Sequence, residues 1–382
     1  MTLLAALGWV SRALAVAGAV YGLAAAALVG RFMARRPAAA ATFPSVTILK
    51  PLHGAAPGLE AALESFCAQD YPAAVQIVLG VRDAADPAAA IARRLAETHA
   101  GLDIVLVVDE TEHGQNRKVS NLINMVPHAR GEIIVLSDAD IEVGPDYLRT
   151  VIGELAAPGV GAVTCLYRGR GDGGFWSRLS AMGIDYRFLP SAVLASSLGL
   201  AHPCFGSTIA LGRPLLATIG GFAAFADCLA DDFEIGAAVR RAGLEVAIPP
   251  IAVIHACAEG DFRALIDHEI RWARTVRRID PAGYAGSGVT HALPLALVGA
   301  ALLGFTPASL GLIFAILLVR IALKARVDAA VGGRAGPWWL LPASDVLSFA
   351  VFLISFAGDT VVWQGRRFRV GRDGVLSKVS RS

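Results

Sequence analysis

Two carboxylates, two residues apart, follow an apolar strand pattern. Asp138 and Asp140 come directly after residues 133–136, so both side chains are expected just beyond the end of a strand. Carboxylates at this spacing can hold a hard divalent cation, which would bridge the two phosphates of a nucleotide. Lys118, at the start of a helical pattern, would neutralise further phosphate charge. The acidic pair alone is a weak signal, and its position after a strand strengthens it.

Two other acids stand at the ends of predicted elements. Asp83 follows the strand pattern of residues 76–81, where a carboxylate can either close a turn or contact a ligand. Asp231 and Asp232 precede a helical pattern at 235–241. They would either stabilise the positive end of that helix or supply a general base that deprotonates an acceptor hydroxyl.

A basic helical pattern near residue 270 carries the remaining chemistry. His268, Arg271 and Trp272 share one helix face because they are three and four residues apart. The Arg can pair with a departing diphosphate, and the Trp can pack against a sugar or a lipid. A basic helix at a membrane interface has the same composition, so both interpretations stay open.

The elements that must position these residues alternate between strands and helices from 42 to 285. Strand patterns cover 46–49, 76–81, 103–108 and 132–137, and helical patterns cover 58–69, 87–99 and 117–125. This alternation predicts an α/β fold with a mostly parallel sheet, in which ligands bind beyond the carboxyl ends of the strands.

Composition places part of the chain in lipid. Of its 382 residues 55% are apolar and only 17% are charged, against about 25% charged in soluble domains. A net charge of +2 argues against a strongly basic nucleic-acid-binding protein. The five cysteines form no CxxC pair, which argues against a zinc site or a disulfide framework.

The first apolar segment is predicted to anchor the chain. Residues 3–30 are nearly all apolar and are followed by Arg31, Arg35 and Arg36. A signal peptide is the alternative, but its positive charge would precede the apolar run. We therefore expect a transmembrane anchor over 1–36, with the following domain in the cytoplasm.

A second apolar region, 287–362, contains two or three hydrophobic segments. Residues 291–303 and 307–323 are predicted to cross the membrane. The stretch 338–362 is expected to be re-entrant or interfacial, because the basic tail at 363–382 favours the cytoplasmic face.

Taken together, these motifs resemble those of membrane-anchored glycosyltransferases with a GT-A fold, of the family 2 and family 21 type. The similarity is to the ceramide glucosyltransferase group, and most of all to bacterial transferases of hopanoid biosynthesis. The group has a D, D, D, (Q/R)xxRW series, matched by Asp83, Asp138, Asp232 and Arg271-Trp272. Residues 114–122 match its GxNxKVxNL segment, with Asn116 and Lys118, whereas His268 replaces the usual Gln or Arg.

The resemblance implies a Rossmann-like mixed sheet and an inverting transfer of N-acetylglucosamine from its UDP donor to bacteriohopanetetrol. It assigns the nucleotide sugar to Asp83, Asn116, Lys118, Asp138 and Arg271, and Mg²⁺ or Mn²⁺ to Asp138 and Asp140. Asp232 would be the general base, Arg271 would stabilise departing UDP, and Trp272, His268 and Cys204 would line the sugar or acceptor pocket.

Three alternatives remain at this point. A ceramide or other sphingolipid glucosyltransferase would use UDP-glucose. A processive polysaccharide synthase shares the motif series but needs a pore of several spans, and a non-enzymatic lipid-binding protein would have no need of these carboxylates. The expected location is the bacterial inner membrane, as a multi-pass protein with its catalytic domain facing the cytoplasm and with lipid, not nucleic acid, as its partner.

Overall fold

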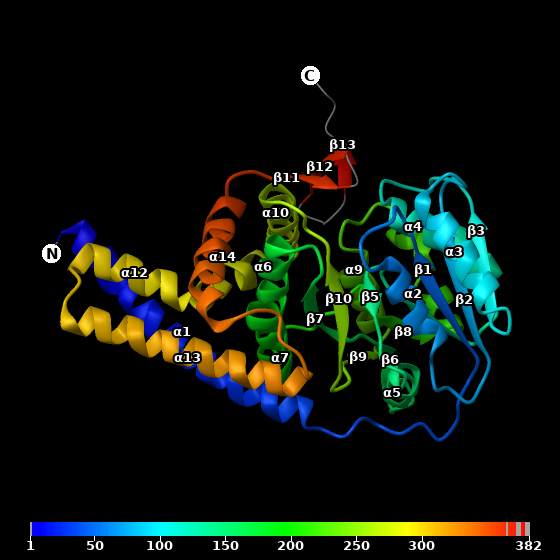
Figure 1. The fold of residues 1–382 in the computed structure, drawn as a ribbon, viewed down its shortest axis with the longest axis horizontal. Coiled ribbons are helices and arrows are strands. Elements are labelled where there is room, and N and C mark those ends of the chain that lie inside the picture. Colours follow the sequence, from blue (N-terminus) through cyan, green and yellow to red (C-terminus); the bar gives the residue numbers. More distant parts are fainter. Residues whose placement is uncertain (1, 364–365, 372–375, 379–382) are drawn as a thin grey trace.

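A seven-stranded mixed sheet forms the core of the central part of the chain, in a computed structural model that describes residues 2–363, 366–371 and 376–378 (Figure 1). Its strands lie in the order β3 (Asp103–Val108), β2 (Val75–Val81), β1 (Val46–Pro51), β4 (Ile133–Leu136), β8 (Ile209–Gly212), β6 (Val160–Val163) and β9 (Glu245–Ala247). Strands β1 to β4 pair in parallel, whereas β8 is antiparallel to both of its neighbours. The carboxyl ends of β1, β2, β3 and β4 therefore share one edge, and the predicted α/β fold is confirmed.

Helices cover both faces of this sheet, and local sequence explains where they begin. They are α2 (Leu59–Cys67), α3 (Pro87–Thr98), α4 (Arg117–Met125), α5 (Tyr147–Leu155), α8 (Arg213–Thr218) and α9 (Asp231–Arg241), with short 3₁₀ turns η1 (Val126–His128) and η3 (Phe222–Phe225). Asp86 caps α3 ahead of Pro87, and Asn116 caps α4. Successive residues of β1, such as Ile48 and Leu49, point into apolar cores on opposite faces of the sheet.

A second, three-stranded sheet lies beside the first. It consists of β5 (Ile141–Glu142), β10 (Ala252–Cys257) and β7 (Leu166–Gly171). Its neighbours are α6 (Phe175–Gly183), a π-helix η2 (Ile184–Phe188), α7 (Leu189–Ser197) and the long helix α10 (Phe262–Ile279). The three strands of this second sheet were not predicted from the sequence. Strand β5 is only two residues long, and β7 lacks a simple apolar alternation.

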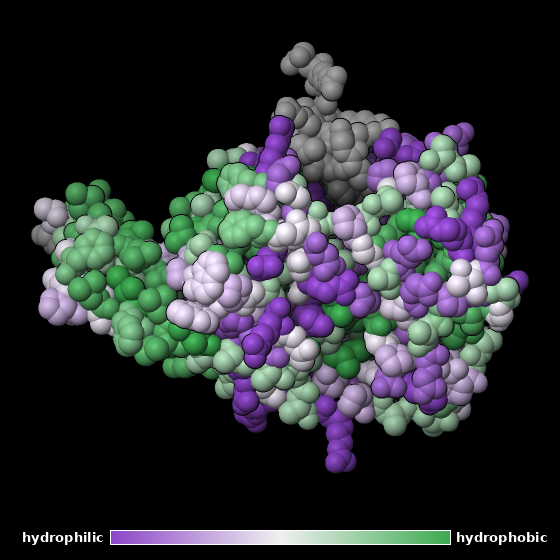
Figure 2. All heavy atoms as spheres, viewed as in Figure 1, coloured by the Kyte–Doolittle hydropathy of each residue, from purple (hydrophilic) through white to green (hydrophobic). Residues whose placement is uncertain are grey.

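The apolar helices form an arm at one end of the molecule. They are α1 (Leu3–Met33), α12 (Ala292–Leu303), α13 (Pro307–Val331) and α14 (Leu341–Ser355). Helices α1, α12 and α13 lie side by side, and hydrophobic side chains cover them in Figure 2. Among the described residues, three helical segments are long and apolar enough to cross a membrane: Leu3–Met33, Pro307–Val331 and Trp338–Ser355.

The structure adds detail to two of the apolar segments, 291–303 and 338–362. Helix α12 has only 12 residues and forms a pair with Pro281–Thr290, comprising α11 (Pro281–Gly286) and η4 (Ser287–Thr290), that is bent by 68°. A broken span or a re-entrant loop has this shape. The stretch 338–362, expected to be re-entrant or interfacial, contains Trp338–Ser355 (η5, Trp338–Leu340, with α14), a helix of sufficient length to cross.

A small antiparallel sheet is formed by the start of the predicted basic tail and the residues just before it. Its strands are β11 (Thr360–Trp363), β12 (Arg366–Val370) and β13 (Leu376–Lys378), while Arg372 and Arg381 of the predicted tail lie outside the described residues. Val361 and Phe368 pack with Leu229, just before the acidic start of α9. Arg274 of α10 donates hydrogen bonds to the carbonyls of Thr360 and Ala357.

Candidate active site

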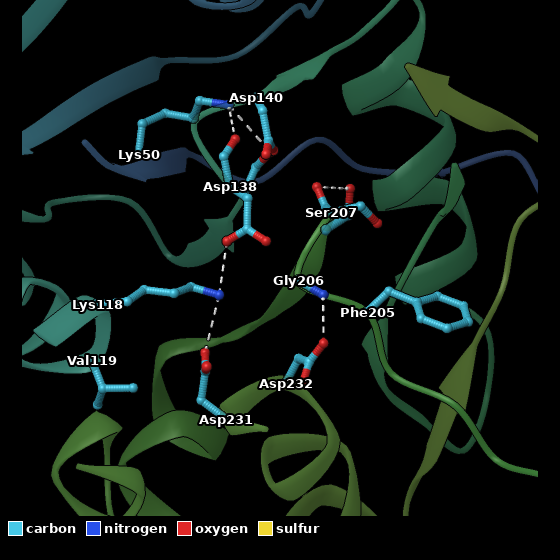
Figure 3. A network of polar contacts seen from close by, with 12 residues as sticks. Lys50, Lys118, Val119, Asp138, Asp140, Phe205, Gly206, Ser207, Asp231 and Asp232 are labelled. Atoms are coloured by element: carbon cyan, nitrogen blue, oxygen red, sulfur yellow. Dashed lines mark hydrogen bonds and ion pairs between the residues drawn. The ribbon is translucent and has the colours of Figure 1, made fainter. Parts of the chain in front are cut away.

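The loop after β4 carries Asp138 and Asp140 and lies against a buried lysine (Figure 3). Lys50, at the carboxyl end of β1, is fully buried, and its Nζ atom lies 2.5 Å from the carbonyl oxygen of Asp138. The same atom lies 3.3 Å from the Ile141 carbonyl oxygen and 3.4 Å from Ser137 Oγ. Burial lowers the pKa of Lys50 to about 7, against the opposing effect of Asp140 and Asp138. The site residues predicted from sequence do not include Lys50, although it is the charged residue at the end of an apolar strand.

Lys118, on the first turn of α4, joins the two acidic segments of the site. Its Nζ atom lies 2.7 Å from Asp138 Oδ1 and 3.1 Å from Asp231 Oδ2. Burial opposes the charge of Lys118, but the carboxylates of Asp138, Asp231 and Asp232 outweigh it and raise its pKa. The predicted neighbours Lys118 and Asp138 are thus brought together.

Asn116 holds the start of α4 against the start of α9. Its Oδ1 accepts a hydrogen bond from the backbone N–H of Val119, and its Nδ2 donates to the carbonyl of Cys228 at 2.7 Å and to Asp231 Oδ1 at 3.3 Å. Asn116 is fully buried. Its contacts in the protein therefore position Lys118 and Asp231.

Asp232 is held by backbone N–H groups rather than by a cation. Its Oδ2 accepts from Gly206 at 3.1 Å, and its Oδ1 accepts from Phe233 at 2.8 Å. Burial raises the pKa of Asp232 to about 6, with a further increase from Asp231 and an opposing effect of Lys118. A carboxylate with its pKa in this range suits proton removal near neutral pH.

Gly206 links Asp232 to the loop after β4. Its carbonyl accepts from the Asp138 N–H at 3.1 Å. A Cβ atom at this position would lie only 2.5 Å from Asp138 Oδ2 and 3.2 Å from Lys118 Nζ. The close approach of Asp138 and Lys118 to this backbone therefore favours glycine, which sequence spacing does not reveal.

Asp138 and Asp140 have the chemistry of a cation site. Burial raises the pKa of Asp138 and the nearby Asp140 charge adds to this, while Lys118 opposes it. Asp140 Oδ1 is buried without a hydrogen-bond partner and lies 3.6 Å from His255 Nδ1. A divalent cation would offset both effects. Within the described part of the chain, no group of three or more His, Cys, Asp or Glu side chains forms a metal site, so a cation here would need further oxygens from a ligand, as Mg²⁺ commonly takes from phosphates.

Helix α10 brings Arg271 to the same carboxylates. Burial lowers the pKa of Arg271, and the charges of Asp140 and Asp138 oppose that change. Among the residues that the structure describes, Arg271 forms no ion pair within 4.0 Å. Its guanidinium is therefore available to an anionic ligand beside the acidic pair.

His268 is hydrogen-bonded to a buried glutamate, Glu259. Its Nδ1 lies 2.5 Å from Glu259 Oε1, which also accepts a hydrogen bond from Ser180 Oγ at 3.0 Å. Burial alone would raise the pKa of Glu259, but the hydrogen bond and charge of His268 outweigh it and lower the pKa. The His268 and Trp272 rings meet edge to face at 4.5 Å between centroids, so this pair supports the Trp272 ring.

An aromatic cluster connects Trp272 with the loop at Gly206. Tyr167 contacts the Trp272 ring at 6.3 Å between centroids, Phe188 of η2 at 4.5 Å and Phe205 at 5.8 Å. Cys204, predicted to line the acceptor pocket, is buried against Gly236 of α9. The Cys204 side chain thus contributes to the core beneath α9.

Asp83 lies on the exposed loop after β2. Its Oδ1 accepts a hydrogen bond from the Ala85 N–H, the geometry of a carboxylate that closes a turn. The structure brings Asp138, Asp140, Lys118, Asp231 and Asp232 into one network, with Arg271 beside it, but it does not include Asp83 in that network.

The comparisons with known proteins point to one family. The family profile described as Glycosyl transferase family 21 matches residues 10–376. Ceramide glucosyltransferase 1 of Caenorhabditis elegans is 22% identical over 234 residues, which cover 61% of this chain and 50% of that protein. The ceramide glucosyltransferase of Gibberella zeae is 28% identical over 134 residues, 33% of this chain and 25% of that protein. The chain thus spans half or less of the length of these curated relatives.

A solved structure covers nearly the whole chain. The mannosyltransferase of Pyrobaculum calidifontis, in complex with GDP-Man and Mn²⁺, is 26% identical with a TM-score of 0.55. The match covers 93% of this chain and 99% of that protein, so the similarity extends beyond the sheet into the apolar helices.

Proposed function

The chain belongs to glycosyl transferase family 21, and from this premise we propose that it transfers a sugar from a UDP-sugar donor to a membrane lipid alcohol. The observation that carries the proposal is the convergence of Asp138, Lys118 and Asp232 at one sheet edge, with the unpaired Arg271 beside them. This group combines cation ligands, a phosphate partner and a candidate base, which together are what glycosyl transfer from a nucleotide diphosphate requires.

In the proposed reaction, the acceptor hydroxyl attacks the anomeric carbon of the donor. Asp232 takes the hydroxyl proton as the new carbon–oxygen bond forms, and the bond to UDP breaks with its electron pair leaving on the diphosphate. A single in-line displacement inverts the configuration. Arg271 stabilises the negative charge that develops on the leaving diphosphate.

Asp138 and Asp140 would hold Mg²⁺ or Mn²⁺, and a bound cation would supply further neutralisation of the diphosphate. The donor-bound Mn²⁺ structure of the mannosyltransferase relative supports a divalent ion for this fold. Asp83 is proposed to contact the uridine part of the donor, since its exposed loop follows a strand at the same edge. His268 and Trp272 are proposed to shape the sugar or acceptor pocket.

The proposed donor is UDP-N-acetylglucosamine and the proposed acceptor bacteriohopanetetrol. This choice rests on the resemblance of segments such as 47–54 and 268–275 to hopanoid-associated transferases. The names of the ceramide glucosyltransferase relatives favour a second candidate, transfer of glucose from UDP-glucose to a sphingolipid. Both candidates keep the catalytic assignments unchanged.

The apolar helices support a lipid acceptor. Three segments of sufficient length and a bent helix pair lie beside the catalytic domain, so an acceptor could reach the site with its chain still in the bilayer. We propose a bacterial inner-membrane location with the domain at 42–285 facing the cytoplasm, as the arginines after α1 favour.

Product mass tests the proposal directly. Purified protein in detergent with Mn²⁺ would receive UDP-N-acetylglucosamine or UDP-glucose, each with bacteriohopanetetrol or ceramide, followed by LC–MS. An N-acetylhexosamine adduct on the hopanoid supports the first candidate, and a hexose adduct on ceramide supports the second. Absence of any sugar adduct and of UDP release with all four pairs would contradict a transferase of this class.

A further inference from the structure

The ammonium group of Lys50 lies against the backbone of the loop that carries Asp138 and Asp140 (Figure 3). We propose that Lys50 is a positioning residue for donor binding, which fixes the backbone of loop 137–141 so that both carboxylates face the diphosphate and its cation. This inference rests on the proposed function, because it assigns a role within the same site.

Lys50 forms hydrogen bonds with three residues of one loop. Its Nζ atom contacts the carbonyl oxygens of Asp138 and Ile141 and the hydroxyl of Ser137. An ammonium group has three N–H donors, so these three acceptors use its full capacity. Because the contacted carbonyls stand on both sides of Asp140 in sequence, they restrict the backbone that directs the Asp140 side chain.

Lys50 holds this loop without occupying its carboxylates. Among the described residues, it makes no ion pair within 4.0 Å, whereas Lys118 binds Asp138 Oδ1 at 2.7 Å. Asp140 Oδ1 also keeps no hydrogen-bond partner. Lys50 therefore holds the loop through its backbone and leaves carboxylate oxygens of the loop available to a ligand.

The burial of Lys50 argues for a role beyond stability. A fully buried charge is costly unless it is hydrogen-bonded, and an apolar side chain of similar size often serves stability equally well. The Phe66 ring, with its centroid 4.0 Å from Nζ, closes the remaining side of the ammonium by a cation–π contact. Such a complete set of partners gives the loop one defined position.

The test is Mn²⁺-dependent binding of UDP to the full chain in detergent, measured by calorimetry with each ligand varied in turn. We expect Lys50→Met to weaken binding of UDP and of Mn²⁺ by about 10- to 100-fold, the usual effect of losing a residue that supports a metal ligand. The matched control is Lys324→Met in α13. Lys324 is also buried, but it is bonded to Asp328 and Tyr186, so this change should lower the melting temperature and leave both affinities unchanged.

Wild-type affinities in Lys50→Met would overturn the inference, as would equal losses of affinity in Lys50→Met and Lys324→Met. If Lys50→Met does not fold, the same binding measurements are made on Phe66→Leu. This variant removes the ring beside the ammonium and keeps the lysine. We expect a shift of about threefold in the same direction, in line with a cation–π contact, and an unchanged affinity would overturn the inference. Failure of the wild-type protein to bind UDP would instead contradict the proposed function.

Discussion

Replacing Asp232 by Asn separates proton removal from donor binding. The side-chain oxygen of Asn can still accept a hydrogen bond from the N–H of Gly206 or of Phe233, which lie 3.1 and 2.8 Å from the carboxylate. The shape of the site and the Lys118 ion pairs with Asp138 and Asp231 remain, because Asp232 takes part in neither. The substitution therefore removes the base and one of the two backbone hydrogen bonds, and it keeps the ion pairs of the site.

The expected loss follows from the role of a general base. Proton transfer by a positioned side chain contributes about 10²- to 10⁴-fold, which corresponds to about 3–5 kcal/mol in the barrier. Burial raises the pKa of Asp232 to about 6, and only the ionised carboxylate can accept the proton. The wild-type rate should therefore fall as the pH drops through about 6, roughly tenfold for each further unit.

The assay is initial rate of product formation by LC–MS across pH 5–8 at saturating donor, with UDP affinity measured in parallel. Asp231→Asn is the matched control, since Asp231 is an adjacent buried acid that pairs with Lys118. It should retain more turnover than Asp232→Asn does, because it leaves the base in place. A turnover within about threefold of wild type in Asp232→Asn, or an equal loss of turnover in Asp231→Asn, would refute the reasoning.

Three further results are expected. Gly206→Ala should reduce turnover by about 10²-fold, because its Cβ would displace the carboxylate of Asp138, and LC–MS rates near wild type would contradict this. His268→Ala should cost about 1–3 kcal/mol of stability by leaving the buried Glu259 carboxylate with Ser180 alone as its partner, so an unchanged melting temperature would be the contrary result. Chelation should abolish product formation and Mn²⁺ should restore it, whereas full activity in chelator would exclude a cation at Asp138 and Asp140.

The first half of the catalytic domain was predictable because its signals are local. The four strand and three helical patterns before residue 138 match β1 to β4 and α2 to α4 within two residues at each end. Asp86 and Asn116 cap their helices through side chains two or three residues from their partners. Such caps can be recognised from the residue types within a short segment of sequence.

The parts that escaped prediction depend on contacts between distant residues. The requirement for Gly206 arises from Asp138 and Lys118, and the burial of Lys50 arises from a loop 87 to 91 residues away. The bend of 68° before α12 was likewise not predicted. The sequence identified the acids together with Asn116 and Lys118, which bond to them, but it did not identify Lys50 or Gly206.

The balance of charge in the site explains why donor and cation should bind together. The site gathers the carboxylates of Asp138, Asp140, Asp231 and Asp232 and the cations of Lys50, Lys118 and Arg271, which leaves one excess negative charge when all are ionised. A diphosphate alone would add to that excess beside Asp138 and Asp140, and a divalent cation alone would reverse its sign. The two together nearly cancel, so each favours the other, and this coupling is reciprocal. Loss of the cation should therefore act first on donor binding, which is why the predicted effects of chelation and of Lys50→Met appear in UDP affinity as well as in turnover.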